Sequence, residues 1–129
     1  MYDKFNNIKI NFNKKKIIIT GASRGIGKKI CDDFKKLGAD VFSISTKNYD
    51  LSKKKDLKDL VNYISSFKKI DVLINNAAIN YSELNKNFSE NKFIKLIDIN
   101  LKSAFILTKA VSKIMIKNKK GRIINIASI

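Results

Sequence analysis

The sequence predicts an α/β fold built on a doubly wound parallel β-sheet, with helices on both faces. Apolar, β-branched runs typical of strands buried on both faces alternate with segments whose apolar residues are three and four positions apart. Three glycines, Gly21, Gly25 and Gly27, separate the first such run from the first helical pattern. Strand, helix and strand within about thirty residues predict a right-handed βαβ unit.

Length and composition favour one domain without a disulfide or a metal centre. The chain has 129 residues, no histidine and one cysteine. Cys31 lies on the apolar side of the first helical pattern, so we expect a core residue there. The sequence contains no apolar run of the ~18 residues that a membrane span needs, and no signal core precedes residue 16. We therefore expect a cytoplasmic protein with no membrane partner.

The net charge of +16 raises the question of a nucleic-acid partner. Nearly all of that charge comes from lysine, since Arg24 and Arg122 are the two arginines. Nucleic-acid readers usually rely on arginine forks and stacked aromatic rings. We expect no specific nucleic-acid partner, and charge-driven nucleic-acid binding remains a weaker alternative.

Residues 1–15 are rich in Asn and Lys and predict a flexible amino-terminal arm ahead of a domain at 16–129. Ile8, Ile10 and Phe12 alternate with polar residues. That alternation suits an extended arm that leads into the first strand, and a disordered leader is an equally good interpretation.

The first strand is predicted at Ile17–Ile19, and a glycine turn separates it from a helix. A helix N-terminus offers unpaired N–H groups and partial positive charge, and glycine removes the Cβ atoms that would block a phosphate. We predict that this turn binds the phosphates of a nucleotide through Gly21, Ser23, Arg24, Gly25, Ile26 and Gly27.

The second strand is predicted at Val41–Thr46, after a helix that ends at Gly38. An acidic residue at the end of this strand would bind the ribose hydroxyls of NAD and repel the extra phosphate of NADP. The strand instead ends with Thr46 and Lys47. Because Lys47 and Arg24 are both placed to meet a 2′-phosphate, we predict NADP as the cofactor rather than NAD.

The remaining chain predicts two more strands and two helices. A helix follows Asp50, and three residues between the second strand and Asp50 are too few for a parallel crossover, so a further strand there is expected to be vestigial or absent. Strands are predicted at residues 71–78 and 121–129. A long helix is predicted from its N-cap Ser89 to Lys117. Its apolar residues form two stripes, so we expect the helix to be buried on two sides.

Four motifs resemble those of the short-chain dehydrogenase/reductase family. Thr20 and the glycine turn are similar to its Thr-Gly-x-x-x-Gly-x-Gly pattern, and residues 75–78 resemble its Asn-Asn-Ala-Gly pattern, with Ala78 replacing glycine. Asn100 matches its helix asparagine, and residues 121–128 match its Gly-x-Ile-x-Asn-Ile-x-Ser stretch. The resemblance implies a Rossmann-like sheet and hydride transfer between a nicotinamide cofactor and a small carbonyl or alcohol substrate. It also implies a possible homo-oligomer through the second apolar stripe of the long helix at 89–117.

The resemblance also implies roles for individual residues. Asp50 and Leu51 would border the adenine, and small residues after the fourth family strand would let the cofactor's ribose approach. Asn100 would kink the long helix and hold a water of the proton relay, and Ser128 would bind the substrate carbonyl. The cofactor-binding set is then completed by Thr46, Lys47, Asn76, Ala77 and Ala78.

The family's catalytic Tyr-x-x-x-Lys pair lies beyond the serine, and this sequence ends at Ile129. A lysine beside the tyrosine is needed because a phenol of pKa near 10 is a poor base at neutral pH. Tyr49 and Lys53 share the spacing but lie on the adenine side. We therefore expect a sheet truncated after the family's fifth strand and a cofactor-binding fragment, nearest to the 3-oxoacyl carrier-protein reductases. A non-catalytic nucleotide-binding module or subunit is the alternative.

Overall fold

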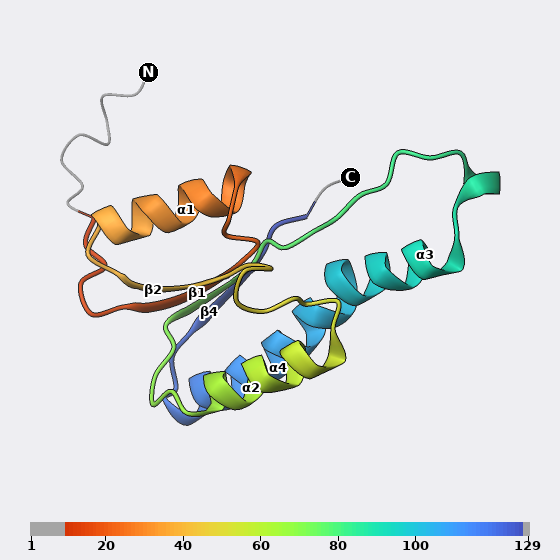
Figure 1. Ribbon diagram of the computed structural model, residues 1–129. Helices are drawn as coiled ribbons and strands as arrows, with labels where there is room; N and C mark the ends of the chain where they lie inside the picture. Colours follow the sequence, from red (N-terminus) through yellow and green to blue (C-terminus); the bar gives the residue numbers. More distant parts are fainter. Residues whose placement is uncertain (1–9, 128–129) are drawn as a thin grey trace, which may run out of the picture.

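The computed structural model describes residues 10–127, and the first nine residues, Ser128 and Ile129 lie outside that range. Strands and helices alternate in the order expected from the sequence (Figure 1). The elements are β1 Lys16–Thr20, α1 Gly25–Lys36, β2 Asp40–Ile44, α2 Lys54–Ser65, β3 Val72–Asn75, η2 Asn85–Asn87, α3 Glu90–Ile97, η3 Asp98–Lys102, α4 Ser103–Lys117 and β4 Arg122–Asn125.

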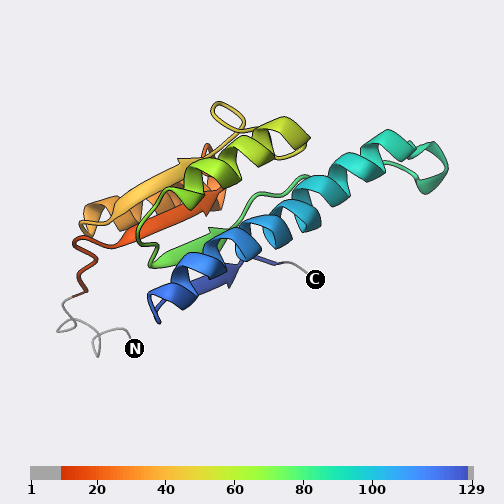
Figure 2. The same cartoon turned by 90° about the horizontal axis from the view of Figure 1, so that it is seen from below.

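The four strands form one parallel sheet in the order β2-β1-β3-β4. Ile17 of β1 pairs with Val41 of β2 on one side and with Val72 of β3 on the other. Helix α1 covers one face, and α2 and α4 cover the other (Figures 1 and 2). The predicted parallel α/β sheet with helices on both faces is confirmed.

The core has two parts because successive strand residues point to opposite faces. Ile18 of β1 packs among the apolar residues of α2 and α4. Its neighbours Ile17 and Ile19 pack towards α1 with Cys31, which is buried as expected. Burial raises the pKa of the Cys31 thiol. All three isoleucines of β1 are fully buried, which agrees with a strand covered on both faces.

The connection from β2 to β3 contains one helix, α2. After Ile44 the chain passes through turns at 45–53 and enters α2. This described stretch contains no strand between β2 and β3, and β3 pairs directly with β1.

The long helix predicted at 89–117 is interrupted by one π-helical turn. Helix α3, the π-helical segment η3 and helix α4 follow one another without a break from Glu90 to Lys117. Ser89 is the N-cap, and its hydroxyl accepts a hydrogen bond from the Lys92 N–H at 3.3 Å. Asn100 lies in the π-helical segment, at the position where the family resemblance implies a kink.

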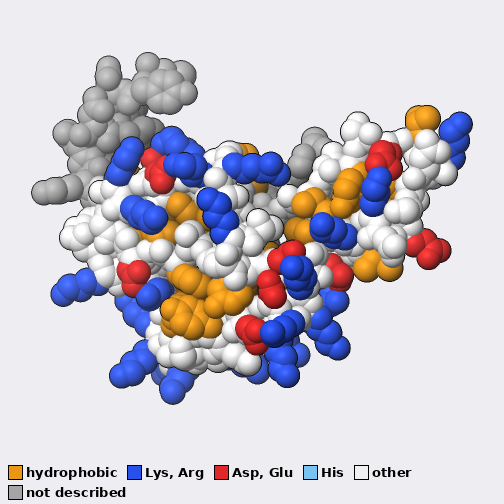
Figure 3. All heavy atoms as spheres, viewed as in Figure 1, with side chains coloured by type: hydrophobic (Ala, Val, Ile, Leu, Met, Phe, Trp, Pro, Cys, Tyr) orange, Lys and Arg blue, Asp and Glu red, His pale blue; other side chains and the backbone are white. Residues whose placement is uncertain are grey.

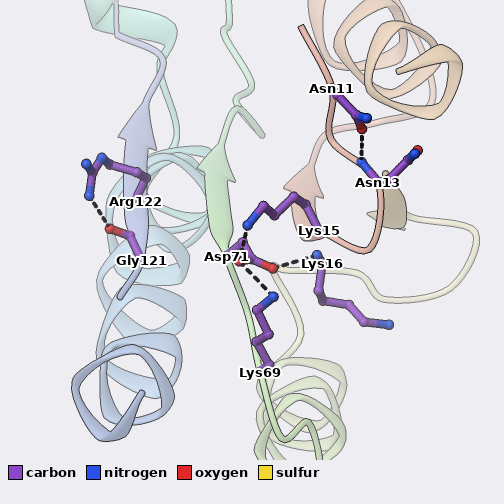
Figure 4. A network of polar contacts seen from close by, with 8 residues as sticks. All are labelled: Asn11, Asn13, Lys15, Lys16, Lys69, Asp71, Gly121 and Arg122. Atoms are coloured by element: carbon purple, nitrogen blue, oxygen red, sulfur yellow. Dashed lines mark hydrogen bonds and ion pairs between the residues drawn. The ribbon is translucent and has the colours of Figure 1, made fainter. Parts of the chain in front are cut away.

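A buried carboxylate joins the starting ends of β1 and β3, at the edge of the sheet away from the glycine turn (Figure 4). The Asp71 carboxylate accepts a hydrogen bond from the Lys16 N–H at 2.9 Å and lies 3.1 Å from the Lys69 ammonium. Burial raises its pKa, but the Lys16 hydrogen bond and the charges of Lys69 and Lys15 outweigh burial, so the Asp71 pKa lies below its ordinary value.

The described end of the amino-terminal arm packs against α1. Phe12 places its ring edge-on to Phe34 at 4.9 Å, and its N–H donates to the Leu37 carbonyl at 2.9 Å. Ile8 lies outside the described residues. None of the helices within residues 10–127 combines the length and the apolar character that a membrane crossing requires.

Candidate functional site

A cavity of about 630 Å³ lies beside the carboxyl ends of β1, β2 and β3. In open parallel sheets this edge is where ligands bind. Three loops, the start of α1 and the π-helical segment η3 supply its walls. The cavity is lined by Gly21, Ser23, Arg24, Gly25, Ile26, Ile44, Ser45, Thr46, Tyr49, Asp50, Leu51, Asn76, Ala77, Ala78, Ile79 and Ile99.

Eleven of the thirteen predicted cofactor-binding residues are among these lining residues, and the exceptions are Gly27 and Lys47. Lys47 is exposed on the turn after β2. Gly27 is buried behind the glycine turn, where an added Cβ would lie 2.3 Å from the Gly21 carbonyl oxygen. The structure therefore gives Gly27 a packing role, because it allows α1 to approach the turn.

Gly21 and Gly25 have backbone conformations that favour glycine. Their φ angles are +67° and +53°. A Cβ at Gly21 would also lie 2.8 Å from the Ala77 Cα, so the glycine turn and the loop after β3 touch at this point. A Cβ at Gly25 would meet no atom within 4 Å, which leaves the backbone at the start of α1 open to a ligand.

The start of α1 is suited to an anion. Its first turn carries no acidic side chain, and its N-cap residue Arg24 is exposed at the cavity. The first N–H groups of a helix have no acceptor within the helix, and they carry the positive end of its dipole. A phosphate placed here would meet these N–H groups.

Thr20 fixes the loop after β3 against the end of β1. Its hydroxyl oxygen accepts hydrogen bonds from the N–H groups of Asn76 at 3.0 Å and Ala77 at 2.9 Å. The Asn76 amide donates back to the carbonyls of Thr20 at 3.0 Å and Gly21 at 3.2 Å. The two loops that line the cavity are thus held as one unit.

The turn after β2 is closed by Asn48. Its side-chain oxygen accepts from the Ser45 N–H at 2.8 Å, and its amide donates to the Ser43 carbonyl at 2.9 Å. Ser45 and Thr46 line the cavity beyond this turn, and neither is acidic. This wall can therefore accept a negatively charged group without repulsion from a carboxylate of the turn.

Asp50 is the acidic residue of the cavity wall, and its carboxylate is held by Ser52. It accepts hydrogen bonds from the Ser52 hydroxyl at 2.7 Å and the Ser52 N–H at 3.0 Å. The Ser52 hydroxyl bond lowers the Asp50 pKa against the opposing effect of burial, with help from Lys53, whose ammonium is 3.8 Å away. Lys53 thus pairs with Asp50.

Asn100 supports the cavity wall without lining it. Its amide oxygen accepts from the Ile79 N–H at 2.8 Å, and its amide nitrogen donates to the Ile79 carbonyl at 2.9 Å. Ile79 lines the cavity. Ser128, the second residue with a predicted catalytic role, lies outside the described residues.

The lining residues that sequence reasoning did not assign to the site are mostly wall residues: Ile44, Ser45, Tyr49, Ile79 and Ile99. Ser45 precedes Thr46 and Tyr49 precedes Asp50, and both of these neighbours are predicted cofactor-binding residues. This adjacency is the only feature of the sequence that points to Ser45 and Tyr49. Thr20 belongs to the motif of the glycine turn, but the spacing of residues in the sequence does not predict its hydrogen bonds to residues 76 and 77.

The side chains of Lys and Arg do not gather at one place on the face shown in Figure 3. They are spread over it and interspersed with Asp and Glu. That distribution differs from the basic stripe typical of a nucleic-acid interface.

Comparison with known families agrees with the motifs. A model of the family described as short chain dehydrogenase matches residues 42–129, which is more than half of the chain. The chain belongs to this family. The resemblance that four motifs indicated is confirmed.

The sequence similarity to individual members of the short chain dehydrogenase family also covers the glycine turn. The 3-oxoacyl-[acyl-carrier-protein] reductase FabG of Rickettsia conorii is 38% identical over 135 residues, covering 93% of this chain and 56% of the relative. The corresponding FabG of Escherichia coli is 30% identical, with 93% and 57% covered. This chain thus spans little more than half the length of these relatives.

Solved structures of family members superpose on nearly the whole chain. A metagenomic short-chain oxidoreductase in complex with NADP has a TM-score of 0.84 at 27% identity, covering 92% of this chain and 64% of that one. A 4-hydroxyisoleucine dehydrogenase complexed with NADH has a TM-score of 0.83 at 32% identity, covering 89% and 56%.

Proposed function

We propose that this chain is the cofactor-binding part of an NADP-dependent oxidoreductase that reduces a carbonyl or oxidises an alcohol. The observation that carries the proposal is the cavity at the carboxyl edge of the sheet, where the glycine turn, the end of β2 and the loop after β3 meet. Family membership supports the same reaction class.

The residues present fit a dinucleotide. Its pyrophosphate would lie at the start of α1, where Gly25 has no Cβ and the first N–H groups of the helix have no acceptor within it. Arg24 would bind the 2′-phosphate, since neither Ser45 nor Thr46 at the end of β2 is an acid. One solved relative is bound to NADP and another to NADH, so the preference for NADP depends on these residues of this chain.

The other assigned residues complete the binding part of the reaction. Asp50 and Leu51 would border the adenine, and Asn76, Ala77 and Ala78 would contact the ribose next to the nicotinamide. Asn100 would position the wall through Ile79. When bound, the reduced cofactor supplies a hydride to the substrate carbonyl carbon, and Ser128 would orient the carbonyl oxygen. The proton would come from a Tyr-x-x-x-Lys pair beyond Ser128.

The edge of the sheet at β4 is where we propose that further polypeptide joins. Among the described residues, β4 pairs with β3 on one side, and Ile124 and Ile126 are partly exposed. An apolar strand with an unpaired edge favours the addition of another strand. The chain would then be a fragment of a sheet truncated after β4, with a strand between β2 and β3 reduced or lost. The exposed Leu101 and Phe105 support a homo-oligomer through the long helix.

The test compares the two arginines of the chain. Arg24→Ala removes a charge at the cavity, and Arg122→Ala removes one at the start of β4, where the guanidinium donates to the Gly121 carbonyl. We expect Arg24→Ala to weaken NADPH binding about 10- to 100-fold, because charge-assisted hydrogen bonds to phosphate are lost. NADH binding should change little, and Arg122→Ala should bind both like wild type. Fluorescence titration measures these affinities.

Two results would contradict the proposal. One is an absence of NADPH binding by the wild-type chain. The other is an equal loss of NADPH affinity in both variants. That result would mean that the nucleotide is attracted by the net charge of the chain and does not bind in the cavity.

A further inference from the structure

Tyr49 is an aromatic residue in the wall of the cavity. It lies in the connection between β2 and α2, is half-buried and lines the cavity together with Ser45, Thr46 and Leu51. None of the motifs by which the chain resembles its family includes Tyr49.

A ring contact orients the side chain of Tyr49, and a hydrogen bond fixes its backbone. Phe42 of β2 packs against it edge-on, with 6.4 Å between ring centroids and an angle of 75° between the planes. The Tyr49 N–H donates to the Ser45 carbonyl at 2.9 Å within the turn that Asn48 closes. A ring fixed in this way loses little conformational freedom when a ligand binds.

The position of Tyr49 relative to the helix N-terminus points to one part of the nucleotide. A dinucleotide with its pyrophosphate at the start of α1 places its adenosine towards the end of β2. The wall on that side comes from residues 44–51. In this wall Tyr49 is the residue with an aromatic ring, and every nucleic base offers a flat aromatic face to such a ring.

We propose that the ring of Tyr49 contacts the adenine ring and thereby positions the nucleotide in the cavity. This inference rests on the proposed function. Phe42 sets the orientation of the Tyr49 ring, and the turn at Asn48 sets its distance from the glycine turn. Tyr49 is a binding residue in this account, and the spacing between Tyr49 and Lys53 has no catalytic meaning.

A matched pair of variants tests the proposal. Tyr49 and Tyr63 both pack on Phe42, but Tyr63 is not among the residues that line the cavity. Tyr49→Ala should weaken the binding of 2′,5′-ADP and of NADPH about tenfold, as expected for a lost base–aromatic contact. Tyr63→Ala should leave both affinities unchanged. Calorimetric titration of the full chain measures both, and equal affinity in wild type and Tyr49→Ala would overturn the proposal.

A spectroscopic test separates ring contact from a merely structural role. The chain contains four tyrosines and no tryptophan, so its emission comes from tyrosine. Contact with adenine should quench part of this emission when 2′,5′-ADP binds to the wild type. Tyr49→Phe should keep the affinity within about twofold, because the ring is retained, and should lose that quenching.

The outcomes of this second test are distinct. Quenching that persists undiminished in Tyr49→Phe would overturn the assignment of Tyr49 while leaving the proposed function intact. A wild-type chain that binds neither 2′,5′-ADP nor NADPH would remove the proposed function and the Tyr49 contact together.

Discussion

The three glycines of the turn differ in what a methyl group would do at each position. At Gly25 the added Cβ meets open space, and the backbone φ is the restriction. At Gly27 it meets the Gly21 carbonyl oxygen and the Asn76 amide. The spacing of the glycines predicted a turn before a helix, but it could not assign these separate roles, because Gly27 also lies against Asn76, which belongs to another loop.

Gly27→Ala should therefore lower stability more than Gly25→Ala. The Gly21 backbone cannot move aside without breaking the turn, so we expect Gly27→Ala to cost about 1–3 kcal/mol in the free energy of unfolding, at the upper end of that range. Gly25→Ala should cost about 1 kcal/mol for its positive φ. Urea unfolding followed by circular dichroism measures both, and a Gly27→Ala protein as stable as the wild type would refute the packing role.

Asp71 gives the chain a pH-dependent contribution to stability. Because its pKa is lower in the folded state than in the unfolded one, the contribution is complete above the unfolded pKa of about 4. It is lost as the pH falls through the folded pKa. Asp71→Asn should lower the free energy of unfolding by about 1–3 kcal/mol at pH 7, with a difference from wild type that shrinks below pH 4.

Asp40→Asn is the matched control for this measurement. The Asp40 carboxylate is 63% exposed and pairs with the Lys16 ammonium at the surface. Solvent screens such a pair, so we expect little change at any pH. A difference between wild type and Asp71→Asn that stays constant from pH 7 to pH 3 would contradict the account of Asp71.

At the scale of elements, the sequence predicted which segments form strands and helices better than where they end. β-Branched runs identified the buried strands, but β2 ends at Ile44 where Thr46 was expected. The Asn48 side chain explains the difference. It accepts a hydrogen bond from the Ser45 N–H and donates one to the Ser43 carbonyl, so the chain forms a turn after Ile44. The π-helical turn at 98–102 could not be predicted either. It is a single turn between two regular helices, so the apolar pattern of the helix does not reveal it.

Asn100 connects that π-helical turn to the cavity, and Asn100→Ala tests the connection. Removal of the amide leaves the Ile79 N–H and carbonyl without these partners. We expect faster hydrogen exchange at the Ile79 amide, about fivefold, and a loss of about 1 kcal/mol in stability. Asn118→Ala, which removes an amide from the far end of α4, is the control. Unchanged exchange at Ile79 would mean that Asn100 does not hold this wall.

At the scale of the whole molecule, the sheet order brings the glycine turn, the end of β2 and the loop after β3 to one edge. The alternation of strands and helices predicted this meeting point, because parallel strands end at a common edge. The wall residues Tyr49 and Ile79 could not be predicted in the same way. Their positions depend on side-chain contacts with Phe42 and Asn100, which no spacing in the sequence encodes.

The most direct test of the central claim is a titration of the ¹⁵N-labelled chain with NADPH, followed through the backbone amide resonances. We predict that the largest shifts occur at residues 21–27, 45–51 and 76–79, around the cavity. Small shifts spread over the lysine-rich surface, with residues 21–27 unaffected, would contradict it.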